Sequence, residues 1–524
     1  MPEQLFYGGS ILTMDPTRPT PEAVYIKNGR IAGMGTLAAT RAQAAPDAVE
    51  IDLQGGCLMP GFIDGHSHIT QFANSLRFTP LSDVKSFDEL AEALLRGRRE
   101  RNLPEGSWLV GFGYDHNQLE EHRHPTRELL DQIAPDIPVL VSHASGHMGA
   151  ANSRALEQAG ITQNTPDPDG GKIGRDENGD PNGYLEENAF MVMGAAVPPA
   201  SEAELLDLLV RAQKVYASYG ITTVQDGLTK EPEFRMLQNA AEQGRLFLDT
   251  VGYADLKSAP DLLREHPEYA GGYRNRFRMG GYKIFLDGSP QGRTAWMTKP
   301  YLGDDPDYRG YPIYSNEAVS AFVETARKEG RQLLAHCNGD AAAEQFITAH
   351  QEHSSTRNVM IHAQLLRRDL LPAMKAAGIM PSYFVAHTWH WGDTHLKNLG
   401  KERAAYISPL QSTIDLGIPF TLHQDTPVLP PNMIDTLWCA VNRVTRDGVP
   451  LAQTEAVSTY DALKGMTLNG AYQYFEEREK GSIQLGKQAD FTVLSQNPLA
   501  IPKRELRSLK VLATYKDGNC VFQA

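Results

Sequence analysis

Two histidines separated by one residue stand directly after a short apolar run, in the segment PGFIDGHSH (60–68). Alternate residues of a strand point to the same face, so His66 and His68 are expected to project together from one strand end. Two neutral imidazoles on one face form a ready pair of metal ligands. A bare H-x-H pair is often only two surface histidines. The apolar run before this pair and further candidate ligands downstream favour a metal site.

Three later apolar segments also end in groups that bind metals. His336 closes QLLAH (332–336), and His362 closes NVMIH (358–362). Asp425 closes FTLHQD (420–425), where His423 shares its face two residues earlier. Each residue has an ordinary alternative, because a histidine at a strand end can be a hydrogen-bonded core residue and an aspartate before Thr-Pro can form a turn. Their joint occurrence on successive strands favours one shared site.

Lys283 lies inside a further strand candidate, YKIFLD (282–287). Strand alternation places it on the face of Phe285 and Asp287, opposite an apolar face that would pack on helices. Lys283 would then point into the interior of a barrel, where an unpaired ammonium is costly. We therefore predict that this lysine is paired or chemically altered.

The middle of the chain alternates short apolar strands with helical stretches, which predicts an α/β fold of the (β/α)8 barrel type. Active-site groups in such barrels lie at the carboxyl ends of the strands. More than eight strand candidates are present, so some must lie outside the barrel. Residues from about 72 to 200 exceed one βα unit, and we interpret them as an insertion over the barrel mouth. Its segment 167–182 is rich in turn residues and is expected to be a loop.

Both ends of the chain read as short strands and hairpins. The turn dipeptides Asn28-Gly29 and Asp517-Gly518 each separate two strand candidates. Two small β segments that are weak alone can pair into one sheet domain. We therefore predict a composite β-sandwich domain from residues 1–57 and 478–524, with the barrel domain occupying residues 58–477.

Composition describes an ordinary globular protein. The chain has 524 residues, an apolar fraction of 41% and a net charge of −14, which argues against nucleic acid as a partner. Its four cysteines form no C-x-x-C pair, so a reduced compartment is expected. We find neither a signal-like N-terminus nor an apolar run of about 18 residues, and expect a cytoplasmic protein without a membrane span.

The order of motifs along the chain resembles the amidohydrolase superfamily, in its N-substituted formamide deformylase-like branch (amidohydrolase family 3). The resemblance implies a metal-dependent hydrolase built on a barrel with a composite β-sandwich. The motifs that carry it are PGFIDGHSH (60–68), GHMGAANSRAL (146–156), ITTVQDG (221–227), YKIFLDGS (282–289), RTAWMTKPY (293–301), LLAHCNGDAA (333–342), IHAQ (361–364), HQDTPV (423–428) and GSIQLGKQADFTVL (481–494).

The same resemblance implies roles for individual residues. One metal ion would be held by His66, His68 and Asp425, and a second by His336 and His362. Lys283 matches a bridging lysine that can be carbamylated in this superfamily. Asp425 would take a proton from a metal-activated water and pass it to the leaving nitrogen. Zinc is the expected metal, in one or two ions, while iron, manganese and nickel stay open.

Several further residues are candidates for substrate binding. His423 stands where the branch usually has a small residue, so it could contact substrate or support the metal ligands. His387 and Trp389 belong to an aromatic segment that is either a packing patch or a substrate wall. His143 and His147, in another mouth loop, could orient a carbonyl oxygen.

The function expected from these features is hydrolysis of a C–N amide bond in a small N-acyl or N-formyl amine. Deamination and cyclic-amide opening use the same chemistry and stay open. A non-catalytic regulatory or binding protein is a third reading, which the complete set of candidate ligands disfavours. The expected partner is a small amide substrate, and the sequence leaves open whether the protein is a homo-oligomer.

Overall fold

The computed structural model describes residues 3–17, 20–103, 106–303, 305–350 and 356–524. The chain forms two compact units, one of Ala73–Leu208 and one of Met1–Phe72 with Leu209–Ala524. Within the described residues, no helix combines the length and the apolar character needed to cross a membrane.

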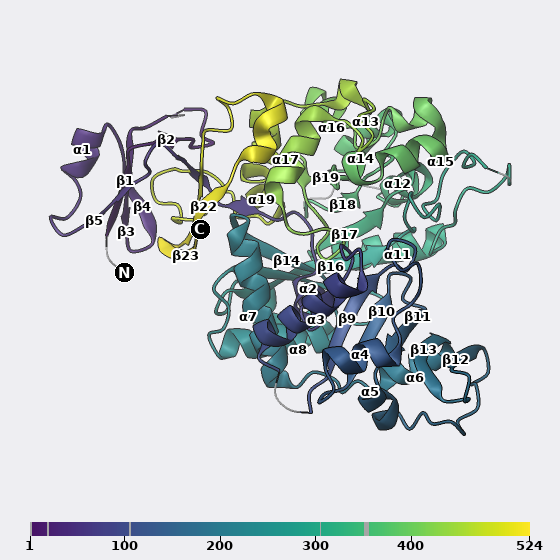
Figure 1. The fold of residues 1–524 in the computed structure, drawn as a ribbon. Coiled ribbons are helices and arrows are strands. Elements are labelled where there is room, and N and C mark those ends of the chain that lie inside the picture. Colours follow the sequence, from purple (N-terminus) through teal and green to yellow (C-terminus); the bar gives the residue numbers. More distant parts are fainter. Residues whose placement is uncertain (1–2, 18–19, 104–105, 304, 351–355) are drawn as a thin grey trace. The chain divides into compact units, whose positions relative to one another are not determined.

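The larger unit contains an eight-stranded parallel sheet in which each strand pairs with its successor (Figure 1). Its first and last strands are linked by Gln473, which accepts from Thr421 Oγ1 (2.6 Å) and donates to the carbonyl of Gly65 (2.8 Å). This order is that of an α/β TIM-like barrel. The strands are β7 (Phe62–Ile63), β14 (Ile221–Thr229), β15 (Asp249–Asp255), β16 (Phe277–Phe285), β17 (Gln332–Cys337), β18 (Val359–His362), β19 (Met380–Tyr383) and β20 (Thr421–Leu422).

Helices follow most of these strands, as the predicted βα alternation requires. They include α8 (Glu231–Glu242), α11 (Asn316–Lys328), α12 (Asp340–Thr348), α13 (Leu371–Ala376), α16 (Leu410–Asp415) and α17 (Met433–Asn442). Strand β16 has the expected two faces. Lys283 is fully buried, with its Nζ 4.9 Å from the ring of Phe285. The hydroxyl of Tyr282 donates instead to Glu329, at the end of α11. The predicted interior position of Lys283 is thus confirmed.

Strands from both chain ends share one sheet, ordered β2 (Ser10–Ile11), β6 (Cys57–Pro60), β21 (Phe491–Leu494), β22 (Val511–Lys516) and β23 (Asn519–Gln523). A second sheet is ordered β4 (Arg30–Gly35), β3 (Ala23–Lys27), β1 (Gln4–Tyr7) and β5 (Val49–Asp52). The ring of Phe6 in β1 lies edge-on to the rings of Phe491 and Tyr515 in the other sheet, with 5.6 and 5.0 Å between ring centroids. The division into a composite domain (1–57 with 478–524) and a barrel domain (58–477) stays a prediction.

The smaller unit is built on a six-stranded sheet. In β9 (Leu109–Tyr114) and β10 (Val139–His143), alternate residues enter two separate apolar cores. The first core includes α3 (Phe87–Arg101) and α4 (Arg127–Ile133), and the second includes α5 (Ser153–Gln158) and α6 (Asn188–Ala195) (Figure 1). Two of the surplus strand candidates therefore belong here and not to the barrel. The place of this unit over the barrel mouth stays a prediction.

The expectation of a loop at 167–182 was wrong in part. Gly171–Arg175 (β12) and Pro181–Glu187 (β13) form an antiparallel hairpin. The turn residues mark only the connection between these strands, where the carboxylate of Asp176 accepts the backbone N–H groups of Asn178 and Asp180. Antiparallel strands tolerate this polar composition because one face of such a sheet can remain in water.

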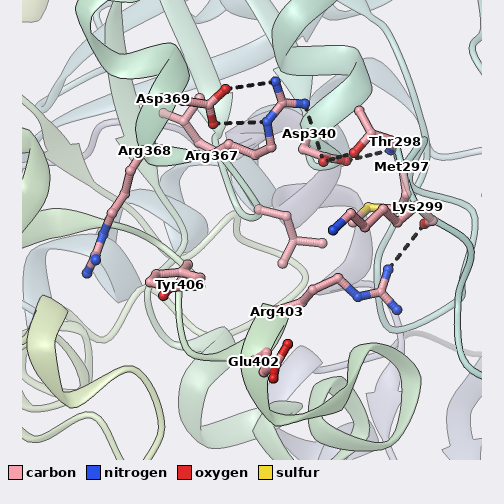
Figure 2. Close-up of a pocket in the computed structure, with 12 residues that line it drawn as sticks. Met297, Thr298, Lys299, Asp340, Arg367, Arg368, Asp369, Glu402, Arg403 and Tyr406 are labelled. Carbon is pink, nitrogen blue, oxygen red and sulfur yellow. Dashed lines mark hydrogen bonds and ion pairs between the residues drawn. The ribbon is translucent and has the colours of Figure 1, made fainter.

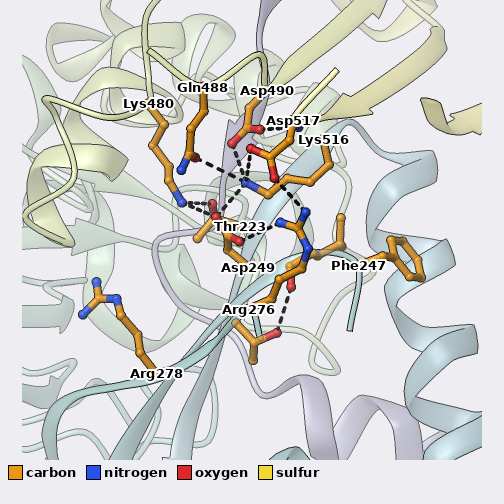
Figure 3. A network of polar contacts seen from close by, with 12 residues as sticks. Thr223, Phe247, Asp249, Arg276, Arg278, Lys480, Gln488, Asp490, Lys516 and Asp517 are labelled. Atoms are coloured by element: carbon orange, nitrogen blue, oxygen red, sulfur yellow. Dashed lines mark hydrogen bonds and ion pairs between the residues drawn. The ribbon is translucent and has the colours of Figure 1, made fainter. Parts of the chain in front are cut away.

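A buried ion-pair network lies where β15 of the barrel begins (Figure 3). Oδ2 of Asp249 pairs with Nζ of Lys516 from β22 (2.7 Å) and also with Lys480. Oδ1 of the same carboxylate pairs with the Arg276 guanidinium (3.1 Å). Lys516 also binds Asp490 at 2.7 Å. Burial alone would raise the pKa of Asp249, but Lys480 and Lys516 hold it below its usual value. The network therefore ties the C-terminal strands to the barrel through buried ion pairs.

The Lys516→Met substitution is expected to lower the free energy of unfolding by about 3 kcal/mol, because it leaves Asp490 buried and only partly paired. The midpoint of chemical denaturation measures this loss. Lys27→Met removes an exposed ion pair with Glu3 and is the matched control, with no expected change. Equal midpoints for the Lys516 variant and the wild type would contradict the role assigned to the network.

Candidate metal centre

The two histidines of the H-x-H pair turn toward one carboxylate. Strand β7 ends at Ile63, so both lie in the turn that follows the strand and not on the strand itself. Their Nε2 atoms nevertheless each lie 3.4 Å from Oδ1 of Asp425. Asp425 follows β20, whose residue Thr421 is linked to the end of β7 through Gln473. Barrel closure thus brings the first and last predicted ligands together.

The other three predicted ligands join the same cluster. Nζ of Lys283 lies 3.0 Å from Nε2 of His66. Nδ1 of His336 lies 3.1 Å from Nε2 of His362, and that Nε2 lies 3.9 Å from Oδ2 of Asp425. All six candidates therefore lie in one chain of contacts at the carboxyl ends of the barrel strands.

Neighbouring groups select the nitrogen that each imidazole can offer to a metal. His66 donates through Nδ1 to Oε1 of Gln225 (2.6 Å), which leaves the Nε2 lone pair free. Nε2 of His336 lies 3.2 Å from the carbonyl oxygen of Gly288 and 3.0 Å from Nδ2 of Asn338; in the tautomer that donates to Gly288, Nδ1 carries no proton. Partners of this kind fix the tautomer and orientation of metal-binding histidines.

His423 completes this pattern for His362. Its Nδ1 lies 2.9 Å from Oγ of Ser382, and its Nε2 lies 3.2 Å from Nδ1 of His362. If Nδ1 of His423 donates to Ser382 and Nδ1 of His362 donates to Nε2 of His423, then Nε2 of His362 carries no proton. That atom faces Asp425. The structure thus gives His423 a direct contact with a candidate ligand, while its substrate contact stays a prediction.

The electrostatics of the cluster suit a bound cation. Burial, with help from Lys283, holds the pKa of His66 well below its usual value and lowers that of His336 to about 4. Burial would raise the pKa of Asp425, but His68, His423 and Lys283 bring it below the ordinary value. Neutral imidazoles beside an ionised carboxylate are the state that metal binding requires.

Two atoms in the cluster are left without a hydrogen bond. Oδ1 of Asp425 and Nδ1 of His68 are buried and have no such partner among the described residues. Buried polar atoms are rarely unpaired. His362 and Asp425 also adopt positive φ values of 71° and 55°, and such backbone strain concentrates at functional sites. The donor set, its charge state and the unpaired oxygen all fit a divalent metal.

His387 and Trp389, which were predicted to bind substrate, pack against other aromatic groups of the larger unit. The His387 ring is buried and stacked on His395, with 3.1 Å between Nδ1 and Nε2. Trp389 packs edge-on against Trp438, with ring centroids 5.3 Å apart, and lies under the Arg507 guanidinium. Their roles toward substrate stay predictions.

His143 and His147 belong to the smaller unit. His143 lies beside Asp115, with 3.5 Å between Nε2 and Oδ1. The side chain of His147 is 67% exposed and pairs with Glu187 at 3.1 Å. Their predicted contact with a substrate carbonyl also stays a prediction.

A cavity of about 440 Å³ opens among segments that follow β16, β17, β18 and β19 (Figure 2). In its wall, Arg403 donates to the backbone carbonyl of Lys299 (3.2 Å), and Asp340 accepts the N–H of Thr298 (2.8 Å). None of the six candidate metal ligands lines this cavity, so it is separate from the reacting groups.

Sequence reasoning missed Gln225, which lies on β14 within the motif ITTVQDG. Besides its contact with His66, Gln225 donates through its own Nε2 to the hydroxyl of Tyr474 (2.8 Å) and to the carbonyl of Gly65 (3.2 Å). Gln225 is fully buried beside Asp226 in the strand ITTVQDGLT, and these two adjacent polar residues within a predicted strand were the available signal. Its partners become visible only when the barrel is assembled.

Replacing Gln225 with leucine is expected to weaken metal binding about 10- to 100-fold, because Nδ1 of His66 loses its acceptor. Isothermal titration of the metal-free chain with Zn²⁺ measures the change. Gln332→Leu is the control, since Gln332 is also a buried barrel glutamine but bonds to Tyr253 and backbone carbonyls. Equal losses of affinity in both variants would reject the proposed role of Gln225.

A parallel α/β barrel whose strand ends gather histidines, a lysine and an aspartate in this way defines a metal-dependent hydrolase. Comparison with protein families agrees with that class. The model described as the amidohydrolase family matches residues 49–522. The chain therefore belongs to the amidohydrolase family, and it is a hydrolase that acts on carbon–nitrogen bonds.

Individual relatives match over the whole length. The chain is 32% identical to a Bacillus subtilis protein named as an amidohydrolase, YtcJ, over 99% of both chains. It is 30% identical to the N-substituted formamide deformylase of Arthrobacter pascens, over 99% of this chain and 98% of the relative. An uncharacterized metal-dependent hydrolase from Pyrococcus furiosus aligns with a TM-score of 0.75 and 26% identity, covering 95% of this chain and 100% of that structure.

Proposed function

We propose that this enzyme hydrolyses the C–N amide bond of a small N-acyl or N-formyl amine. One observation carries the proposal, namely that all six candidate ligands meet in one contact chain around Asp425. The full-length similarity to an N-substituted formamide deformylase supports an amide of this size. Water and amide react to give a carboxylic acid, formic acid for a formamide, and a free amine.

The ligand set would consist of His66, His68 and Asp425 on one side and of His336 and His362 on the other, with Lys283 between them. Imidazole and carboxylate ligands suit zinc. A divalent ion bound here supplies Lewis acidity, which lowers the pKa of a water and polarises the amide carbonyl. Asp425, held ionised by its neighbours, accepts a proton from the attacking water and returns it to the leaving nitrogen.

We also propose that Lys283 carries a carbamate in the active enzyme. Burial lowers the pKa of its amine to about 7, so much of it is uncharged at neutral pH. The neutral amine adds to CO₂ to form an N–C bond, releases one proton and becomes an anionic carbamate. That anion removes the repulsion between an ammonium and two divalent ions, and it would allow a second ion to bind. Without it, one tightly held ion is expected.

The test is turnover of a panel of N-formyl and N-acyl amines by purified enzyme loaded with Zn²⁺, with released acid and amine both quantified. Stoichiometric release of the two products, abolished by a chelator and restored by metal, is the expected result. Ammonia released from an aminated ring would instead indicate deamination, and a single ring-opened product would indicate a cyclic amidase. Binding of amides without turnover by fully loaded enzyme would favour a regulatory protein and overturn the proposal.

A further inference from the structure

A second group of metal-binding side chains lies within the smaller unit. Asp115 and His116 directly follow β9, and His143 ends the neighbouring parallel strand β10. Tyr114 and His143 are opposite each other in the register of these strands. The sheet therefore brings together residues that are far apart in the sequence, at the carboxyl ends of two parallel strands.

The spacing of the three ligand atoms is that of a coordination shell. Nδ1 of His116 lies 3.4 Å from Nε2 of His143, and these nitrogens lie 3.9 and 3.5 Å from Oδ1 of Asp115. Good hydrogen bonds between such atoms span about 2.7–3.2 Å. A tetrahedral zinc ion with bonds of about 2.0–2.1 Å holds its ligand atoms about 3.3 Å apart. The three atoms are thus too widely spaced for good hydrogen bonds and suitably spaced to share an ion.

Neighbouring groups also shape the site. Nδ1 of His143 lies 2.9 Å from Oγ of Ser145 and accepts the backbone N–H of Ser145 (3.1 Å), so an ion bound at Nε2 would displace a proton from that atom. The His124 ring packs on His116 with centroids 4.0 Å apart, and burial with these neighbouring imidazoles lowers the pKa of His124 to about 4. The side chain of His143 is 11% exposed, while those of Asp115 and His116 are each 28% exposed, so an ion can reach the group from solvent.

We propose that Asp115, His116 and His143 form a second zinc site, built from residues of the smaller unit alone. Two imidazoles and one carboxylate leave a fourth position for water or another ligand. A bound ion would join the segment after β9 to the end of β10. This inference does not depend on the proposed amide hydrolysis, because it concerns binding of Zn²⁺ by the folded chain.

The test is equilibrium dialysis of the full chain, free of any polyhistidine tag, against micromolar Zn²⁺, followed by elemental analysis. Asp115→Asn and His116→Asn are each expected to remove one ion per chain relative to the wild type. Two variants are used so that a local folding defect in one does not decide the result, and circular dichroism checks both. In a His66→Asn chain, where the barrel centre is damaged, the same two substitutions are expected to remove one further ion.

His122→Asn is the matched control, because His122 is an exposed histidine of the same segment and lies outside the cluster. It is expected to keep the wild-type zinc content. Unchanged zinc content in folded Asp115→Asn and His116→Asn chains would overturn the proposal. An equal loss in the His122 variant would also overturn it, because zinc would then be bound by surface histidines in general.

Discussion

Replacing Asp425 with asparagine is expected to lower kcat for amide hydrolysis about 10³-fold. The amide keeps the shape of the side chain but cannot accept the proton of the attacking water, and general acid–base catalysis contributes about 10²–10⁴-fold. Oδ1 of Asp425 also lies 3.4 Å from both His66 and His68, so the substitution removes an anionic ligand as well. Steady-state kinetics at saturating Zn²⁺ measure the loss.

Metal content must be measured on the same sample, because it separates the two roles of Asp425. A lower kcat in a variant that keeps its metal indicates lost proton transfer. Asp435→Asn is the control, since Asp435 pairs with Arg507 and His390, away from the ligand cluster. It is expected to leave kcat unchanged. An Asp425→Asn enzyme with wild-type kcat would remove Asp425 from the mechanism.

The Lys283→Ala substitution is expected to remove one metal ion per chain and to lower the rate at least about 100-fold. Loss of one ion costs several kcal/mol of charge stabilisation in the transition state, and each 1.36 kcal/mol is about tenfold in rate. Added acetate or propionate is expected to restore part of the metal content and part of the rate, because a free carboxylate can occupy the place of the missing carbamate. Elemental analysis and product release report the two quantities independently.

Lys480→Ala is the matched control, because Lys480 is also buried but is paired with Asp249 and Glu476. It is expected to lower stability while leaving the metal stoichiometry and the response to acetate unchanged. The carbamate itself is tested in the wild type by carbon-13 labelling with bicarbonate, since carbamates are lost in acid. A Lys283→Ala enzyme with wild-type metal content and rate would exclude Lys283 from the site.

The sequence was sufficient to predict the class of fold, and the same strand patterns indicate the candidate ligands that we propose. Strand alternation placed Lys283 inside the barrel, and in the structure this lysine is buried with its Nζ 3.0 Å from Nε2 of His66. His336, His362 and Asp425 each end or follow an apolar segment, and the carboxyl ends of parallel strands meet at one end of a barrel. These predictions depend on local periodicity and on one general property of barrels, so they need no knowledge of long-range contacts.

Local patterns failed where the partner strand decides the outcome. Segment 167–182 looks like a loop, yet all of β12 and the start of β13 fall within it, because pairing with a neighbour outweighs weak propensity. The strand candidates that became β9 and β10 could not be excluded from the barrel, since a buried strand has the same composition in either sheet. Membership of a sheet is a property of pairing and not of the strand alone.

The tertiary structure alone decided which atoms of the candidate ligands are free to bind. The sequence contains His66, Gln225 and His423, but only barrel closure places an acceptor at Nδ1 of His66 and an imidazole at Nδ1 of His362. The tertiary structure likewise brings Asp115 and His116 next to His143, because β9 and β10 pair with His143 opposite Tyr114. The sequence determined the chemical groups that this protein can use. Their tautomers, charge states and separations depend on contacts between distant residues, which the folded chain sets.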